Sequence, residues 1–346
     1  MMCAMLPFVR PILQMIYGAL EAEVMENAVT YFTITLIGYP LSAMGHVCAA
    51  VLRAMGKNRE AAITTIGFNV INVIGNAILI YGLHMGVAGA AIATNLSHAA
   101  FAISGLYLAH RKNMPVHFVE LLRFRFDFDA IRRVMRIGMS TGLESGLFNF
   151  GKLLVSGIVS SFGTVYIAAN SVANTINNIG WNIVGSCGTV LLTVVGQCVG
   201  AGEPEQAKYY TKKVLRIGTV MSLALFSTVF LLRHQLVRIF NFGEETLEVA
   251  AYYTAVAAVL SIVAQYSWAF VPVNAFRAAG DIRYAVTLSI FTMFVFRVGA
   301  CYLLNALFPS LGLMCVYIAL AIDWLFRLVS NSIRFRSGKW LHKKLI

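Results

Sequence analysis

The sequence predicts an all-α membrane protein, a polytopic bundle of about ten transmembrane helices in two pseudo-symmetric lobes. Hydrophobic residues make up 59% of the 346-residue chain, and charged residues make up only 12%, about half the charged fraction of an average soluble protein. The charges are also clustered, with long apolar runs between the clusters. These observations exclude a disordered region, a disulfide scaffold, a nucleic-acid-binding protein and most soluble enzymes.

The apolar runs define the predicted spans one by one, because a transmembrane helix needs about 20 apolar residues. Two uncharged runs, 61–110 and 153–202, are long enough for two crossings each, and turn sequences at 82–86 and 162–164 divide them into helical hairpins. The remaining spans lie between clusters of charged residues. The predicted limits are a partial span within 1–20, followed by 27–53, 62–83, 86–109, 137–161, 165–198, 212–233, 247–276, 284–306 and 312–334.

The charges of the loops predict the orientation of the chain. Most of the 27 Lys and Arg residues lie in alternate loops, at 53–59, 111–136, 208–216, 277–283 and 334–344. Loops rich in Lys and Arg stay in the cytoplasm, so we expect the C-terminus and the 111–136 linker to be cytoplasmic. A surface that binds nucleic acid would not alternate with the spans in this way.

An internal repeat predicts two lobes. The segment RAMGKNREA, from Arg53 to Ala61, corresponds to RAAGDIRYA, from Arg277 to Ala285, 224 residues later. Tandem halves are typical of secondary transporters, whose sites lie between them. We therefore expect a partial N-terminal lobe at 1–110, a cytoplasmic linker at 111–136 and a six-helix lobe at 137–346. With this offset, two helices and part of a third would precede Met1, so we expect an N-terminally truncated chain.

Several motifs resemble those of the multidrug and toxic compound extrusion (MATE) transporters, and the likeness extends over nearly the whole chain. They are the cytoplasmic motif after a Pro-containing helix, at 40–56 and 272–280, GVAGAAIAT at 86–94, SSFGTVYIAANSVANTI at 160–176, VVGQCVGAGEPEQAKYYTKK at 194–213 and RSGKW at 336–340. The resemblance implies a twelve-helix antiporter that exports organic cations, drugs or related amphipathic compounds in exchange for Na⁺ or H⁺. It also implies a multi-pass protein of the plasma membrane with no enzymatic activity and no cofactor beyond the coupling ion. We expect a monomer whose partners are the small-molecule substrate and membrane lipid.

Polar residues inside the spans are the candidate site, because lipid accepts them only with a partner, a cavity or a function. Ser145, Asn149 and Lys152 share one face of the helix that enters at 137, and Glu144 lies at the edge of that face. We expect Glu144 to be the ion- or proton-coupling residue. The following helix carries a second stripe, formed by Asn170, Asn174, Asn177 and Trp181, and we expect both stripes to line a substrate cavity. The alternative is that these residues only bond neighbouring helices to each other.

Two further positions complete the candidate residues. In the sodium-coupled branch of the family that the chain resembles, a carboxylate lies in the tenth helix, whereas this sequence offers only Gln265 and Tyr266 there. This puts a Na⁺ site of that type in doubt and leaves both residues as candidates for the cavity wall. Asp323 and Arg327 are four residues apart in the last span, which predicts a structural ion pair. Arg297 is expected to bond either a carbonyl group or Asp323.

Three alternatives to an antiporter are considered. A flippase for lipid-linked oligosaccharides has a related fold and would need a strongly cationic cavity for pyrophosphate. Lys152 and Arg297 are the main candidates, and two residues supply little of that charge. A membrane-embedded enzyme has no supporting motif, because GLESG at 142–146 lacks the central serine of a nucleophile elbow. A non-functional fragment is the third. His46, His84 and His98 have no ligand spacing, so no metal site is predicted.

Overall fold

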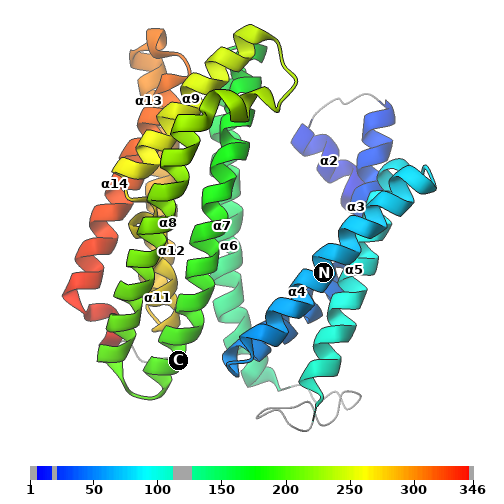
Figure 1. The fold of residues 1–346 in the computed structure, drawn as a ribbon, viewed down its shortest axis with the longest axis vertical. Coiled ribbons are helices and arrows are strands. Elements are labelled where there is room, and N and C mark those ends of the chain that lie inside the picture. The colour runs from blue at the N-terminus through cyan, green and yellow to red at the C-terminus, as the bar shows by residue number, and fades with distance from the viewer. Residues whose placement is uncertain (1–5, 18–21, 112–126, 343–346) are drawn as a thin grey trace. The chain divides into compact units, whose positions relative to one another are not determined.

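The computed structural model describes residues 6–17, 22–111 and 127–342, and every regular element in these ranges is helical. The chain forms two compact units, residues 1–125 and 126–346 (Figure 1). Eight helices in the described ranges are long and apolar enough to cross a membrane. Large apolar side chains also face outward from these helices, such as Leu231 at 72% and Ile333 at 64% exposure. An outer surface of this kind fits lipid better than water.

The first unit is built mainly on three long helices. It contains η1 (Leu6–Phe8), α2 (Val9–Tyr17), α3 (Ala22–Ala54), α4 (Asn58–Asn76), the π-helical η2 (Ala77–Gly82) and α5 (Gly86–Ala109). Helices α3 and α5 form its largest interface. Gly105 permits the close approach, because a Cβ atom there would lie 2.7 Å from Cβ of Cys48. The nine residues of α2 extend about 14 Å and lie in the partial span predicted within 1–20, of which residues 1–5 and 18–20 are outside the described ranges.

The second unit has long helices and several interrupted ones. It contains α6 (Phe128–Ser160), α7 (Thr164–Gly200), α8 (Pro204–Arg238), α9 (Glu244–Val263), α10 (Tyr266–Phe270), α11 (Pro272–Ala278), α12 (Ile282–Phe291), the π-helical η3 (Thr292–Gly299), α13 (Ala300–Leu307), η4 (Pro309–Leu311), α14 (Met314–Ser337) and η5 (Lys339–His342). Helix α7 packs against α8, α9 and α11, whereas α6 packs against α12 and η3. This arrangement places the polar stripes of α6 and α7 within one unit.

The span predicted for 247–276 is not one continuous helix, because the chain there forms three helices. Helix α9 ends at Val263, and Gln265 has a left-handed backbone with φ of +43° before α10 begins. A second break lies at Pro272, whose nitrogen carries no hydrogen for a helical bond. Hydropathy is continuous through both breaks, so the apolar pattern alone could not reveal them.

Helix α6 begins earlier than predicted. It starts at Phe128, inside the segment predicted as linker, and residues 112–126 of that segment lie outside the described ranges. Helix α6 has 33 residues but is not among the eight helices that are long and apolar enough to cross a membrane. Its hydropathy is lowered by Glu144, Asn149 and Lys152, three residues of its predicted cavity face.

The repeated segments form the same turn. Helix α3 ends with Gly56 at φ of +77°, where the N–H of Gly56 bonds the carbonyl of Arg53 at 2.9 Å and the N–H of Lys57 bonds that of Leu52 at 2.9 Å. Helix α11 ends with Gly280 at φ of +87° and the same two bonds, at 3.0 and 2.8 Å. This is the Schellman pattern, in which glycine supplies the left-handed residue. A third copy, at Gly202, joins α7 to α8.

Candidate functional site

Two adjoining cavities lie within the second unit. The first has a volume of about 460 Å³ and is lined by residues of α6, α7, α10, α11, α12 and α14. The second has a volume of about 450 Å³ and is lined by residues of α6, α7, η3 and α14. Both volumes are in the range of sites for drug-sized molecules. The residues common to the two linings are Asn149, Lys152, Asn178 and Trp181.

The two polar stripes predicted from the sequence meet at these cavities. Ser145 lines the first cavity, and Asn149 and Lys152 line both. From α7, the second cavity receives Asn170, Asn174 and Asn177, and both cavities receive Trp181. Helical spacing brings each stripe together, because residues four or seven apart share a face. The role of these residues in binding a substrate stays a prediction.

Glu144 forms an ion pair that the sequence did not reveal. Nη2 of Arg277 donates to both carboxylate oxygens of Glu144, at 2.7 and 2.6 Å. The bond joins α6 to α11 at the wall of the first cavity, where Glu144 is 7% exposed. Arg277 lies in the repeated segment, whose basic residues were interpreted only as markers of cytoplasmic loops. The available signal for a role of Arg277 was its position in the repeat, close to the end of a helix.

A second ionic cluster is buried next to the cavities. Nε of Arg327 bonds Oδ1 of Asp323 at 2.7 Å, which is the pair that their spacing predicts. Nη2 of Arg297 pairs with Oδ2 of Asp323 at 2.6 Å and thereby links η3 to α14. Of the two partners expected for Arg297, a carbonyl group or Asp323, the structure shows Asp323. Arg327 also donates to the carbonyl of Ser289 at 3.0 Å. One carboxylate therefore serves two arginines.

The phenyl ring of Phe148 is surrounded by cations. Nζ of Lys152 lies 5.1 Å from the ring centre, and the guanidinium carbons of Arg297 and Arg327 lie 5.3 and 5.9 Å away. Lys152 also lies 5.9 Å from the ring of Trp181. Cations at such distances are attracted by the negative faces of aromatic rings. These contacts stabilise the positive groups beside the cavities.

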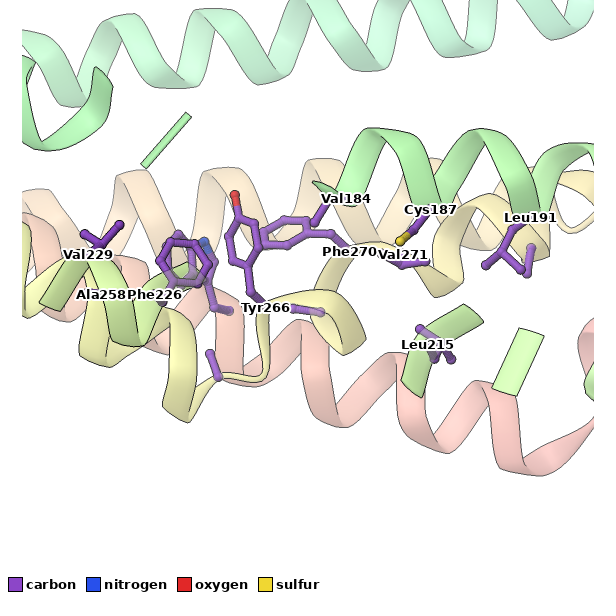
Figure 2. Close-up of a cluster of buried hydrophobic side chains, with 14 of the residues drawn as sticks. Val184, Cys187, Leu191, Leu215, Phe226, Val229, Ala258, Tyr266, Phe270 and Val271 are labelled. Atoms are coloured by element: carbon purple, nitrogen blue, oxygen red, sulfur yellow. The ribbon is translucent and has the colours of Figure 1, made fainter. Parts of the chain in front are cut away.

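Gln265 and Tyr266, predicted as cavity residues, are not among the residues that line the two cavities. Tyr266 is 1% exposed and packs in the apolar core of the unit (Figure 2). Its ring contacts Trp181, Phe226 and Phe270 at centroid distances of 5.7, 5.5 and 5.0 Å. The break after α9 is the cause, since it turns residues 264–266 away from the register of an unbroken helix. Trp181 thus lies between Tyr266 and the cavities.

The first unit has a polar cluster that the sequence analysis missed. Nδ2 of Asn72 lies 3.4 Å from the hydroxyl of Thr94 and 3.3 Å from that of Ser97, which links α4 to α5. Asn76 donates to Oδ1 of Asn72 at 3.0 Å. The spacing of four residues between Asn72 and Asn76 was the signal for it. In the ranges described, no group of three or more His, Cys, Asp or Glu gathers as a metal site would require.

A family model and several known proteins match the chain. The family model MatE matches residues 1–78 and 141–303. A probable multidrug resistance protein NorM from Thermotoga maritima is 24% identical over 338 residues, which are 94% of this chain and 70% of that protein. The multidrug export protein MepA from Staphylococcus aureus is 23% identical over 323 residues, 90% of this chain and 70% of MepA. The chain thus spans about two thirds of the length of these curated relatives.

Solved structures share the fold. The outward-facing conformation of a multidrug resistance MATE family transporter of the MOP superfamily superposes with a TM-score of 0.88 at 20% identity, covering 98% of this chain and 75% of that chain. A MOP superfamily transporter from Pyrococcus furiosus, whose reversed binding-pocket polarity suggests a different function, superposes with a TM-score of 0.87 at 22% identity, covering 99% and 76%. At these identities the likeness concerns the fold alone.

Proposed function

The chain belongs to the MatE family and is thus an integral membrane transporter rather than an enzyme. We propose that it exports amphipathic organic compounds. Export would proceed by alternating access and be driven by inward movement of Na⁺ or H⁺. The observation that carries this proposal is the pair of adjoining cavities of the second unit, lined by ionisable and amide side chains of its helices. Lipid does not accept such groups without a function or a partner.

Glu144 is the proposed coupling residue. Its carboxylate is buried and held by Arg277 at the wall of the first cavity. A proton or Na⁺ that binds Glu144 would neutralise it and free Arg277, and loss of the cation would restore the pair. Arg277 and the coupling ion would thus compete for Glu144, which gives the α6–α11 contact a paired and an unpaired state. A coupled transporter needs two such states, whose populations its ligands shift.

We place the protein in the plasma membrane with its C-terminus in the cytoplasm. The basis is the distribution of Lys and Arg, which are concentrated in alternate loops, including 334–344. A monomer is proposed as the working unit, because both cavities are lined by residues of one unit of a single chain.

A flippase for lipid-linked oligosaccharides is the second candidate. The specific observation in its favour is the cationic lining of the cavities, to which Arg277 and Arg327 contribute beyond Lys152 and Arg297. Pyrophosphate would require such charges. The Pyrococcus furiosus transporter illustrates that this fold accommodates pockets of different polarity.

The test is export by proteoliposomes that contain the chain, with an imposed gradient of either H⁺ or Na⁺. We expect one gradient to drive export of an amphipathic dye, and the Glu144→Gln variant to lose at least about tenfold of the rate, because an amide neither binds Na⁺ as a carboxylate does nor exchanges a proton. The matched control is Glu245→Gln, which removes an exposed carboxylate from the first turn of α9. Equal rates for the two variants would contradict the role of Glu144, and no gradient-driven export by the unsubstituted chain would contradict the antiporter.

A further inference from the structure

The ionisable groups around the two cavities carry an excess of positive charge. Within the described part of the chain, the cations are Lys152, Arg277, Arg297 and Arg327, and the carboxylates are Glu144 and Asp323. Glu144 is occupied by Arg277, and Asp323 is shared by the other two arginines. Four cations with two carboxylates leave a formal charge of +2 within and beside the cavities.

Lys152 is the cation that lacks a carboxylate. No carboxylate in the described ranges lies within ion-pair distance of its ammonium group, whose contacts are the rings of Phe148 and Trp181. Lys152 is exposed at the point where both cavities meet. An unpaired ammonium group within a membrane-embedded unit is costly, so its position calls for a ligand that supplies the missing negative charge.

The cavity wall next to Lys152 also fits an apolar group. Phe148 lines the first cavity and Trp181 lines both, so an aromatic ring bound there could pack against either side chain. The asparagines of α7 offer amide groups that hydrogen-bond without adding charge. A bound organic cation, by contrast, would lie beside Lys152 and the arginines, and like charges at such distances repel.

We propose that these cavities select an organic anion, in which a carboxylate is attached to an aromatic or other apolar group, and that Lys152 pairs with the carboxylate. This inference rests on the function proposed above and replaces the organic cation expected from the family resemblance. It makes Lys152 a residue that determines specificity, whereas Glu144 remains the coupling residue.

The test compares two fluorescent probes that differ in the sign of one charge. Dansylglycine carries a carboxylate, and dansylethylenediamine carries an ammonium group on a linker of similar length. Their dissociation constants are measured with the full chain in nanodiscs of zwitterionic lipid, so that the membrane adds no charge of its own. We expect the unsubstituted chain to bind dansylglycine at least about tenfold more tightly than the cationic probe.

Variants assign the preference to one side chain. Lys152→Gln should raise the dissociation constant of dansylglycine about tenfold and leave that of the cationic probe unchanged or lower. Lys152→Arg should keep the ratio of the two dissociation constants within about threefold of that of the unsubstituted chain. Lys213→Gln is the matched control, since it removes an exposed lysine of α8 that lines neither cavity. Circular dichroism checks that each variant keeps its helical content.

The outcomes separate this inference from the proposed function. Tighter binding of the cationic probe by the unsubstituted chain would overturn the inference, as would equal losses in Lys152→Gln and Lys213→Gln. Export that depends on Glu144 would survive either result. A competition experiment identifies the source of the anion. Naphthylacetate should displace dansylglycine at lower concentrations than dihexanoyl phosphatidylglycerol does. The reverse order would overturn the proposal that the ligand is a soluble organic acid and would indicate a lipid headgroup instead.

Discussion

Asp323 is the residue on which the buried charges of the second unit depend. Its side chain is fully buried, and its two oxygens pair with Arg327 at 2.7 Å and Arg297 at 2.6 Å. Both guanidinium groups have their ion pair at this one carboxylate. Removal of the one shared carboxylate would therefore leave two uncompensated cations against Phe148.

We expect Asp323→Asn to destabilise the protein by about 3–5 kcal/mol, the effect typical of breaking a buried pair from one side. The measurement is the melting temperature of the purified chain in detergent, with the exposed substitution Glu245→Gln as control. The double variant Asp323→Asn, Arg297→Gln should regain part of the loss, because one of the two stranded cations is then absent. An equal melting temperature for Asp323→Asn and the control would contradict this view of the cluster.

The sequence predicts short-range pairs of the site better than long-range ones. The Asp323–Arg327 bond follows from a spacing of four residues on one helix. The Glu144–Arg277 bond joins residues 133 positions apart, and nothing in the local sequence of either residue specifies the other. The stripes on α6 and α7 were recognisable for the same reason as the first pair, since each belongs to a single helix.

At the scale of elements, the break between α9 and α10 is the feature that hydropathy did not predict. Helix α5 begins and ends as predicted, at Gly86 and Ala109, because a turn sequence and a basic loop delimit it. The break at Ala264–Gln265 contains neither glycine nor proline, so it has no local signature. Ala264 corresponds to Pro40 in the first copy of the repeat, 224 residues earlier. Helix α3 continues through Pro40, so the copy that has the proline is the one without a break.

Gln265 should be strained, since its φ of +43° places its Cβ atom too close to the backbone. We expect Gln265→Gly to be as stable as the unsubstituted protein or more so, by about 1 kcal/mol, because glycine adopts this conformation freely. Gln265→Ala is the control, since it removes the same polar group but keeps the Cβ atom. Thermal melting of both variants tests the expectation, and a glycine variant less stable than the alanine variant would contradict it.

At the scale of the whole molecule, the repeat is expressed as matching local geometry in each unit. The turn after α3 and the turn after α11 have the same pair of backbone bonds around a left-handed glycine. The flanking residues differ: Lys57 of the first copy corresponds to Asp281 of the second, and Asp281 accepts two bonds from Arg334, at 2.8 and 2.6 Å. The backbone pattern was predictable from the nine-residue similarity, but this contact to α14 was not.

The repeat and the loop charges together predict one side of the membrane for both turns. Arg59 and Arg283 are exposed residues 224 positions apart. We expect cysteines at these positions to react with a membrane-impermeant maleimide only from the cytoplasmic side, and a cysteine at Glu245 to react only from the other side. Labelling of intact cells and of inside-out vesicles measures this against the unsubstituted chain, in which four of the five described cysteines are buried. Reaction of the Arg59 and Arg283 positions from opposite sides would contradict the duplicated arrangement.

The shared carboxylate of Asp323 also sets an order for biosynthesis. Arg297 precedes Asp323 in the chain, so the segment Ile282–Leu307 enters the translocon before the carboxylate that pairs with its guanidinium group. Insertion of such a group into lipid is unfavourable by about 2.5–3.5 kcal/mol. The nascent segment should therefore stay beside the translocon, or in contact with its helical neighbours, until α14 emerges and supplies the negative charge.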